Sequence, residues 1–227
     1  AHAGKQLREG KGFDQIVVGT QFQPLDPILN LNARRQKQYR HHLPGPAHPL
    51  QHQPPAPEDL SRATLPWRLL PAVAGGGKFL DMGIHELDLF DFLFGAIEEV
   101  HGIATNQGGL YDVEDTVTAT WRHASGVQGY GSWCYVCGQG EDAIEIVGSK
   151  GRIRFEFFSD KPLELVNEAG QQRVDIPNPA HVQQPFIQSI VDDLNGLAPC
   201  PGNVDSAVRS TWVADEILKH YRQQKGY

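Results

Sequence analysis

Residues 75–95 read GGGKFLDMGIHELDLFDFLFG, and this stretch decides how the rest of the chain is interpreted. Winding residues 79–94 as a helix, at about 100° per residue, leaves the circumference apolar nearly all round. Three polar side chains, Asp81, His85 and Asp88, fall within about 60° of one another on that helix. A helix that is apolar almost all round is buried, and charged groups on it need partners or a water-filled cleft. The stripe therefore predicts either an internal ion pair or a pocket.

Taken alone, the residues leave two interpretations of this stripe open. Asp81 lies in the first turn, where the helix dipole favours an acid, and His85 one turn later could simply pair with it. The glycine triplet favours a binding site instead. Gly75, Gly76 and Gly77 carry no side chains, so a flat ligand could approach the backbone N–H groups at the helix entrance.

Composition and charge narrow the class of protein. The chain has 227 residues, 40% of them hydrophobic, which is enough for one large domain or two small ones with hydrophobic cores. The formal charge of -7, without a long basic block, argues against nucleic acid and anionic membranes as partners. With no long apolar run and no signal peptide, we expect a soluble, cytoplasmic protein. The only methionine is Met82, so we expect a fragment, a trimmed chain or part of a longer protein.

Two patterns that resemble metal sites are not expected to bind metal. Cys134 and Cys137 have zinc-like spacing, yet no second pair completes four ligands, and residues three apart in a strand point to opposite faces. Residues 40–66 contain four histidines among several prolines, without rigid spacing. We predict that residues 40–66 form an extended or partly mobile loop.

After residue 95 the pattern changes from helix to strand. Seven short runs show alternation or β-branched residues: 100–106, 116–123, 127–136, 142–148, 152–158, 162–168 and 172–177. Their short connections favour antiparallel pairing, because parallel neighbours need long crossovers. Two helices, 181–196 and 203–224, close the chain. The prediction is an α+β fold, an open and mainly antiparallel β-sheet with helices packed on one face.

The motif GGGKFLDMGIHELD resembles the GGG-x-x-x-D-x-G-x-H-x-x-D signature of the glucose-fructose oxidoreductase, inositol dehydrogenase and MocA (Gfo/Idh/MocA) family. Further stretches that resemble the family are Trp67-Arg68, FLFG, VED, EIVGSKGRIRF and APCPGNVDSAVRSTWVADEIL. The resemblance implies a substrate-binding and oligomerisation domain over 25–227, similar to the C-terminal domain of dihydrodipicolinate reductase. Residues 1–24 would then be the end of a truncated dinucleotide-binding Rossmann domain.

The resemblance also implies a reaction, hydride transfer between NAD or NADP and a sugar, cyclitol or related carbinol. By motif position, His85 matches the general acid/base, and Asp81 matches the residue that binds a substrate hydroxyl and orients the histidine. Imidazole suits this role because it accepts protons near neutral pH. The other positions carried over are Arg68 and Asp88 for substrate, and Gly76 and Gly77 for the cofactor.

The chain departs from the family pattern where the cofactor is concerned. No GxGxxG follows a strand, and the lysine of the family's EKP motif is missing. We therefore expect NAD or NADP to be bound mainly by a domain missing from this chain, and the chain alone to be inactive. The second hypothesis is a catalytically inactive, stand-alone sugar-binding or dimerisation module. A homodimer or homotetramer through the sheet is expected.

Overall fold

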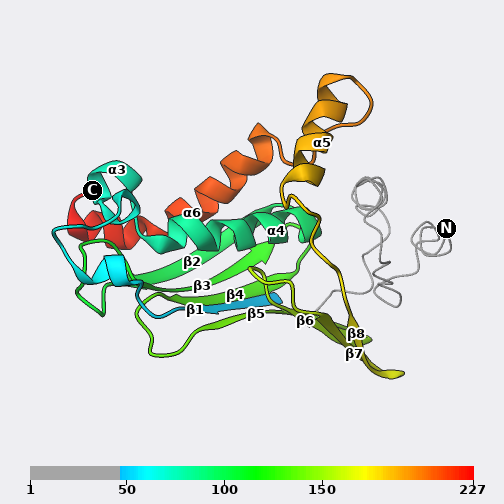
Figure 1. Cartoon of the computed structure of the whole chain (residues 1–227), viewed down its shortest axis with the longest axis horizontal. Helices are drawn as coiled ribbons and strands as arrows, with labels where there is room; N and C mark the ends of the chain where they lie inside the picture. The colour runs from blue at the N-terminus through cyan, green and yellow to red at the C-terminus, as the bar shows by residue number, and fades with distance from the viewer. Residues whose placement is uncertain (1–46) are drawn as a thin grey trace. The chain divides into compact units, whose positions relative to one another are not determined.

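A computed structural model describes residues 47–227 (Figure 1). The predicted end of a Rossmann domain, residues 1–24, lies outside the described residues, as does the first part of the 40–66 segment. The described chain contributes to two compact units. One comprises Pro46–Ile144 with Asp205–Tyr227, and the other contains Glu145–Val204.

Eight strands are hydrogen-bonded in the order β2-β3-β4-β1-β5-β6-β7-β8. Their bounds are β1 Ala47–His52, β2 Ile97–Thr105, β3 Thr116–His123, β4 Gln128–Cys134, β5 Glu141–Gly148, β6 Gly151–Phe155, β7 Leu163–Asn167 and β8 Gly170–Val174. Antiparallel pairing joins β2 to β3, β3 to β4, β6 to β7 and β7 to β8, whereas β1 runs parallel to β4. The predicted open, mainly antiparallel sheet is confirmed, and so are all seven predicted strands.

The loop prediction for 40–66 is wrong at residues 47–52, which form the inner strand β1. Alternate residues are buried along this strand, and Ala47 and Gln51 are fully covered. The prolines hid this alternation, because proline has no N–H for a sheet and is normally confined to edges. Pro49 is nevertheless accommodated, with Gly131 of β4 close beside its ring.

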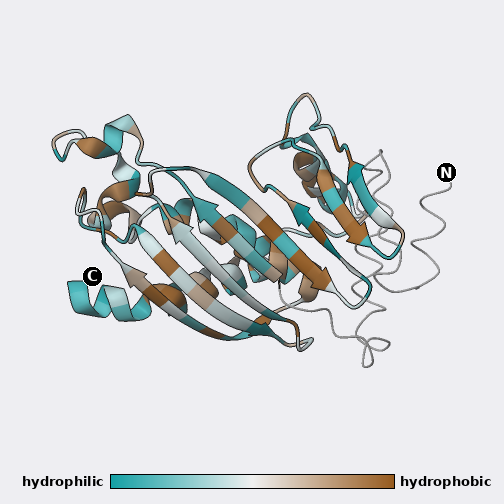
Figure 2. Ribbon diagram, turned by 90° about the horizontal axis from the view of Figure 1, so that it is seen from below, coloured by the Kyte–Doolittle hydropathy of each residue, from teal (hydrophilic) through white to brown (hydrophobic). Residues whose placement is uncertain are grey.

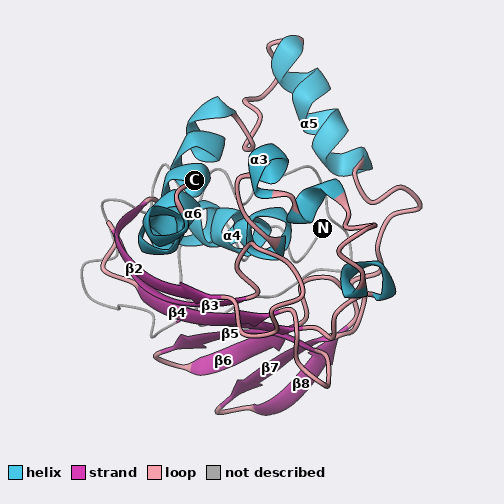
Figure 3. Ribbon diagram, turned by 90° about the vertical axis from the view of Figure 1, so that its left-hand side faces the viewer, coloured by secondary structure: helices cyan, strands magenta, loops and turns pink. Residues whose placement is uncertain are grey.

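The helices of the larger unit lie on one face of β2, β3 and β4 (Figures 1 and 3). They are the short α3 (Pro71–Ala74), the π-helical turn η5 (Phe79–Gly83), α4 (Ile84–Phe94) and α6 (Val204–Lys225), preceded by the 3-10 turns η3 (Pro57–Leu60) and η4 (Trp67–Leu69). This arrangement confirms the predicted helical layer, the helix over 79–94 and the last helix.

Glycines on the strands let the helices approach closely. A Cβ on Gly102 of β2 would lie 2.7 Å from the backbone of Ile217 in α6. A Cβ on Gly129 of β4 would lie 2.1 Å from the indole of Trp121, which packs in turn on Phe90 of α4 at a ring separation of 5.6 Å. The core therefore sits between the sheet and the two long helices.

The second unit contains β6, β7 and β8 and the helix α5 (Gln184–Leu194), which confirms the predicted helix over 181–196. Within residues 47–227, none of the helices combines the length and hydropathy that a membrane-spanning segment needs.

Candidate functional site

The glycine triplet is held by the chain's own side chains. Gly75 ends α3 in the left-handed region, with φ of 72°, and its carbonyl accepts a hydrogen bond from Arg222 Nε at 2.9 Å. The Gly77 N–H donates to Glu114 Oε1 at 2.7 Å. A Cβ on Gly77 would lie only 2.3 Å from the Glu114 carbonyl oxygen, so a larger residue would not fit. The triplet thus lets the helix entrance pack against the loop before β3 and against α6.

This packing bears on the predicted cofactor contact. Gly76 and Gly77 are both buried, and a dinucleotide that used the Gly77 N–H would have to displace Glu114. The described residues therefore do not fit a dinucleotide at this point, and the role assigned to Gly76 and Gly77 stays a prediction. Residues 47–227 also contain no group of three or more His, Cys, Asp or Glu side chains arranged for a metal ion.

Two of the predicted substrate residues are brought together. Arg68 Nε lies 2.9 Å from Asp81 Oδ2, and the two side chains are 48% and 42% exposed. The guanidinium of Arg68 also lies over the ring of Trp67, 4.6 Å from its centroid. Arg68 and Asp81 therefore form a solvent-facing ion pair rather than an internal one.

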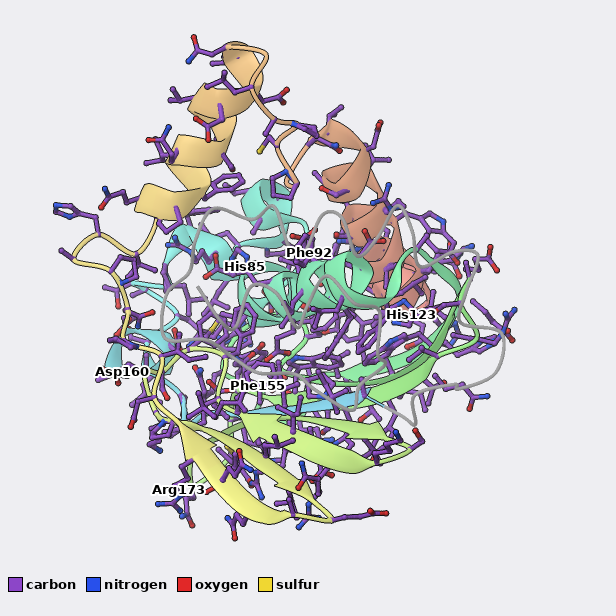
Figure 4. The ribbon with its side chains drawn as sticks, turned by 90° about the vertical axis from the view of Figure 1, so that its right-hand side faces the viewer. His85, Phe92, His123, Phe155, Asp160 and Arg173 are labelled. Atoms are coloured by element: carbon purple, nitrogen blue, oxygen red, sulfur yellow. The ribbon has the colours of Figure 1, made fainter. Side chains whose placement is uncertain are left out.

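His85 is exposed at the start of α4, in the helical layer rather than among the strands (Figure 4). The turn before it, which contains Asp81, is π-helical. Backbone hydrogen bonds in a π turn span five residues instead of four, so winding this turn at the α-helical angle was wrong. Single π turns within helices are frequent at functional sites. The exposed segment from Asp81 to His85, with Arg68 beside it, is the candidate site.

In this structure Asp88 of α4 forms a hydrogen bond to α6. Its Oδ1 accepts a hydrogen bond from Ser210 Oγ of α6 at 2.7 Å, and the side chain is half-buried. A substrate-binding role for Asp88 stays a prediction, and it would compete with this bond.

The buried acids of the helix are Glu86 and Asp91, which lie outside the predicted polar stripe. Asp91 is 6% exposed and forms a two-bond ion pair with Arg209 of α6, at 2.9 Å from Nε and 2.7 Å from Nη2. Glu86 is fully buried and accepts a hydrogen bond from Trp133 Nε1 of β4. Burial raises the pKa of Glu86 to about 8, although the Trp133 bond lowers it, so this carboxyl is protonated at neutral pH.

The two acids of the VED sequence before β3, Glu114 and Asp115, have structural partners. Burial raises the pKa of Glu114 to about 7, opposed by the hydrogen bond from Gly77. Asp115 is fully buried, and its two oxygens accept the N–H groups of Gln107 and Gly108 at 2.8 and 2.7 Å. Glu114 and Asp115 hold the loops around the helix entrance.

The fold and motif together define a domain of an oxidoreductase family. Residues 49–154 match the profile of the GFO/IDH/MocA C-terminal domain. The part of the chain that contains the helix motif therefore matches the C-terminal domain of the Gfo/Idh/MocA family, and the resemblance in that motif is confirmed.

Curated relatives extend this result. "Oxidoreductase P35" of Formosa agariphila is 28% identical over 158 residues, which cover 69% of this chain and 48% of that protein. "Myo-inositol 2-dehydrogenase" of Thermotoga maritima is 34% identical over 106 residues, which cover 43% of this chain and 31% of that protein. The chain thus spans half or less of the length of these relatives.

Solved structures confirm the fold class. Levoglucosan dehydrogenase in complex with NADH has a TM-score of 0.67 and 17% identity, with 87% of this chain and 61% of that chain covered. UDP-N-acetylglucosamine 3-dehydrogenase from Acidithiobacillus ferrooxidans has a TM-score of 0.61 and 16% identity, with 82% and 56% covered. At these identities the likeness shows the fold alone.

Proposed function

We propose that this chain is the substrate-binding and oligomerisation part of an NAD(P)-dependent oxidoreductase that acts on a sugar, cyclitol or related carbinol. The observation that carries the proposal is the exposed helix entrance. It presents Asp81 with Arg68 at 2.9 Å, and His85 at the start of the following helix, within the residues that match the family. Relatives named as dehydrogenases of inositol and of sugar derivatives support the substrate class.

In this proposal the chain's own residues bind the substrate and move a proton. Asp81 accepts a hydrogen bond from a substrate hydroxyl, and the ion pair with Arg68 at 2.9 Å holds the Asp81 carboxylate in place. Imidazole titrates near neutral pH, so His85 accepts the proton that a carbinol must lose when its carbon is oxidised. NAD or NADP, held mainly by a part of the protein outside this chain, would supply the hydride acceptor.

Nuclear magnetic resonance of the histidine side chains tests the proposed substrate binding directly. Titration with myo-inositol or levoglucosan should shift the His85 resonances in a saturable way, and Asp81→Asn should weaken that binding. His101 of β2 is also exposed and provides the matched control, so His101→Asn should leave binding unchanged. Equal shifts at every exposed histidine, or unchanged binding by Asp81→Asn, would refute the assignment.

One observation favours the second candidate, an inactive stand-alone sugar-binding or dimerisation module. The Asp81 carboxylate is already bonded to Arg68, as in a purely structural ion pair. The coding sequence upstream separates the two candidates. A glycine-rich βαβ unit of about 120 residues, the usual size of such a domain, supports the enzyme. Translation that starts near Ala1 supports the module.

The open face of the sheet is the proposed oligomer interface. On the face of β1 to β4 away from the helices, Ile103 is 71% exposed, and Tyr130 is 50% exposed and stacks on His48 at 4.8 Å. Thr118 and Thr120 lie between them by strand register. Figure 2 shows this side of the sheet, where apolar and polar residues are mixed.

Sedimentation of the purified chain tests this interface. Ile103→Lys should convert the dimer or tetramer to monomer, because a charge would be buried at the contact. Val208→Lys, at a site on α6 that is 63% exposed, is the matched control and should leave the oligomer intact. A wild-type chain that is monomeric at all concentrations would contradict the proposal.

A further inference from the structure

The two cysteines at the end of β4 lie close together. β4 ends at Cys134, the chain bends at residues 135 and 136, and Cys137 Sγ comes to 3.7 Å from the Cys134 carbonyl oxygen. Cys137 lies beyond the end of the strand, so the expectation from strand alternation, opposite faces for the two side chains, does not apply to this pair. The Cys137 thiol therefore lies beside the backbone of Cys134, and Thr116 Oγ1 lies 3.8 Å from Cys134 Sγ.

The surroundings of the pair differ from those of the third cysteine. Cys134 and Cys137 are both partly accessible, and the Cys137 thiol donates to the carbonyl of Gln139 at 3.0 Å. Cys200, in contrast, is 6% exposed, and its Sγ lies 3.4 Å from Ser189 Oγ. A small solute can therefore reach the pair more easily than it can reach Cys200.

We propose that Cys134 and Cys137 form a reversible intramolecular disulfide when the chain meets a small-molecule disulfide such as oxidised glutathione. The thiolate of one cysteine attacks oxidised glutathione, which gives a mixed disulfide and one glutathione thiolate. The thiolate of the other cysteine then displaces the second glutathione. In total one protein S–S bond forms, one glutathione S–S bond breaks, and two molecules of reduced glutathione carry the two thiol protons.

The position of the pair gives the disulfide a structural consequence. Trp133, just before Cys134, donates to Glu86 of α4, and Tyr135, just after it, donates to Gln51 of β1 at 2.8 Å. Oxidation would fix the bend next to both of these buried bonds. A ring of so few residues removes little chain entropy from the unfolded state, so any preference for the disulfide in the native chain must come from the geometry of the bend.

Peptide mass spectrometry tests the proposal on the full chain. The reduced protein is incubated with oxidised glutathione, blocked with N-ethylmaleimide, unfolded and digested with trypsin. Cys134 and Cys137 lie on one tryptic fragment, residues 123–150, and Cys200 lies on another. The expected fragment 123–150 lacks two hydrogen atoms and carries neither maleimide nor glutathione. Burial and the neighbouring Cys134 raise the pKa of the Cys137 thiol, so oxidation should be faster at higher pH.

Variants and an unfolded control complete the test. Cys200→Ser should leave the disulfide unchanged, whereas Cys137→Ser should leave glutathione attached to Cys134. The native chain should become oxidised at a lower ratio of oxidised to reduced glutathione than the chain in urea. Maleimide on both cysteines, glutathione that persists on the wild-type pair, or equal oxidation in urea would each overturn the proposal.

Discussion

Replacing Glu86 by glutamine should remove a large pH dependence of stability. Glu86 is fully buried, and its pKa is about 8 in the folded protein against an ordinary value of 4.5. Between those values the folded state holds a proton that the unfolded state has released. The free energy of unfolding therefore falls by about 1.4 kcal/mol for each unit that the pH rises. Over two units, from about pH 5.5 to 7.5, this group alone costs the wild type about 3 kcal/mol.

Glutamine keeps an oxygen that can accept the Trp133 hydrogen bond but does not titrate. The difference in free energy of unfolding between Glu86→Gln and the wild type should therefore grow with pH in favour of the variant. Urea unfolding, followed by tryptophan fluorescence at several pH values, measures this difference, and groups that titrate in both proteins cancel. Glu58→Gln, at an exposed site, is the matched control and should show a constant difference. A Glu86→Gln difference constant to about 0.5 kcal/mol would show that Glu86 is ionised in the folded chain and refute the reasoning.

Three further substitutions test the packing around the helix. Gly77→Ala should destabilise the fold by about 1–3 kcal/mol, because its methyl group would meet the Glu114 carbonyl oxygen at 2.3 Å; an unchanged Tm would contradict this packing. Arg209→Met should cost about 2 kcal/mol in urea unfolding by leaving the buried Asp91 carboxylate unpaired, less than for a fully buried pair because Arg209 is 43% exposed. Arg68→Ala should cost less than about 1 kcal/mol by the same assay because its ion pair is half-exposed, and a larger loss would mean that the pair is structural.

Much of the fold could be predicted from local sequence patterns. The strands after residue 95 have clear alternation and short turns, so their existence and antiparallel pairing followed from the sequence. β1 could not be predicted, because its pairing partner β4 is about 80 residues away and Pro49 masks the alternation. The position of β1 between β4 and β5 depends on tertiary packing, and local sequence patterns carry no information about such packing.

The candidate site was predicted in part. The sequence singled out Asp81 and His85 as polar groups on an apolar helix, but it did not show that both are exposed or that Arg68 pairs with Asp81. The periodicity also failed to show that Glu86 and Asp91 are the buried acids, because their partners Trp133 and Arg209 come from distant elements. An acid on the apolar side of a helix is the one signal that pointed to them.

The interpretation of the glycine triplet differs most between the sequence and the structure. Its lack of side chains suggested an approach for a cofactor, whereas the structure shows Gly77 pressed against Glu114 and Gly75 bonded to Arg222. Sequence alone could not separate these cases, because a missing Cβ serves a ligand and a neighbouring loop equally well.

Calorimetric titration of NADH into the purified chain tests the central claim most directly. The account holds that the chain supplies the substrate half of an oxidoreductase and that the cofactor half lies outside it. It predicts no saturable heat of NADH binding, with or without myo-inositol. Saturable binding with micromolar affinity would contradict it, because the described residues would then hold a dinucleotide at or beside the Gly77–Glu114 contact.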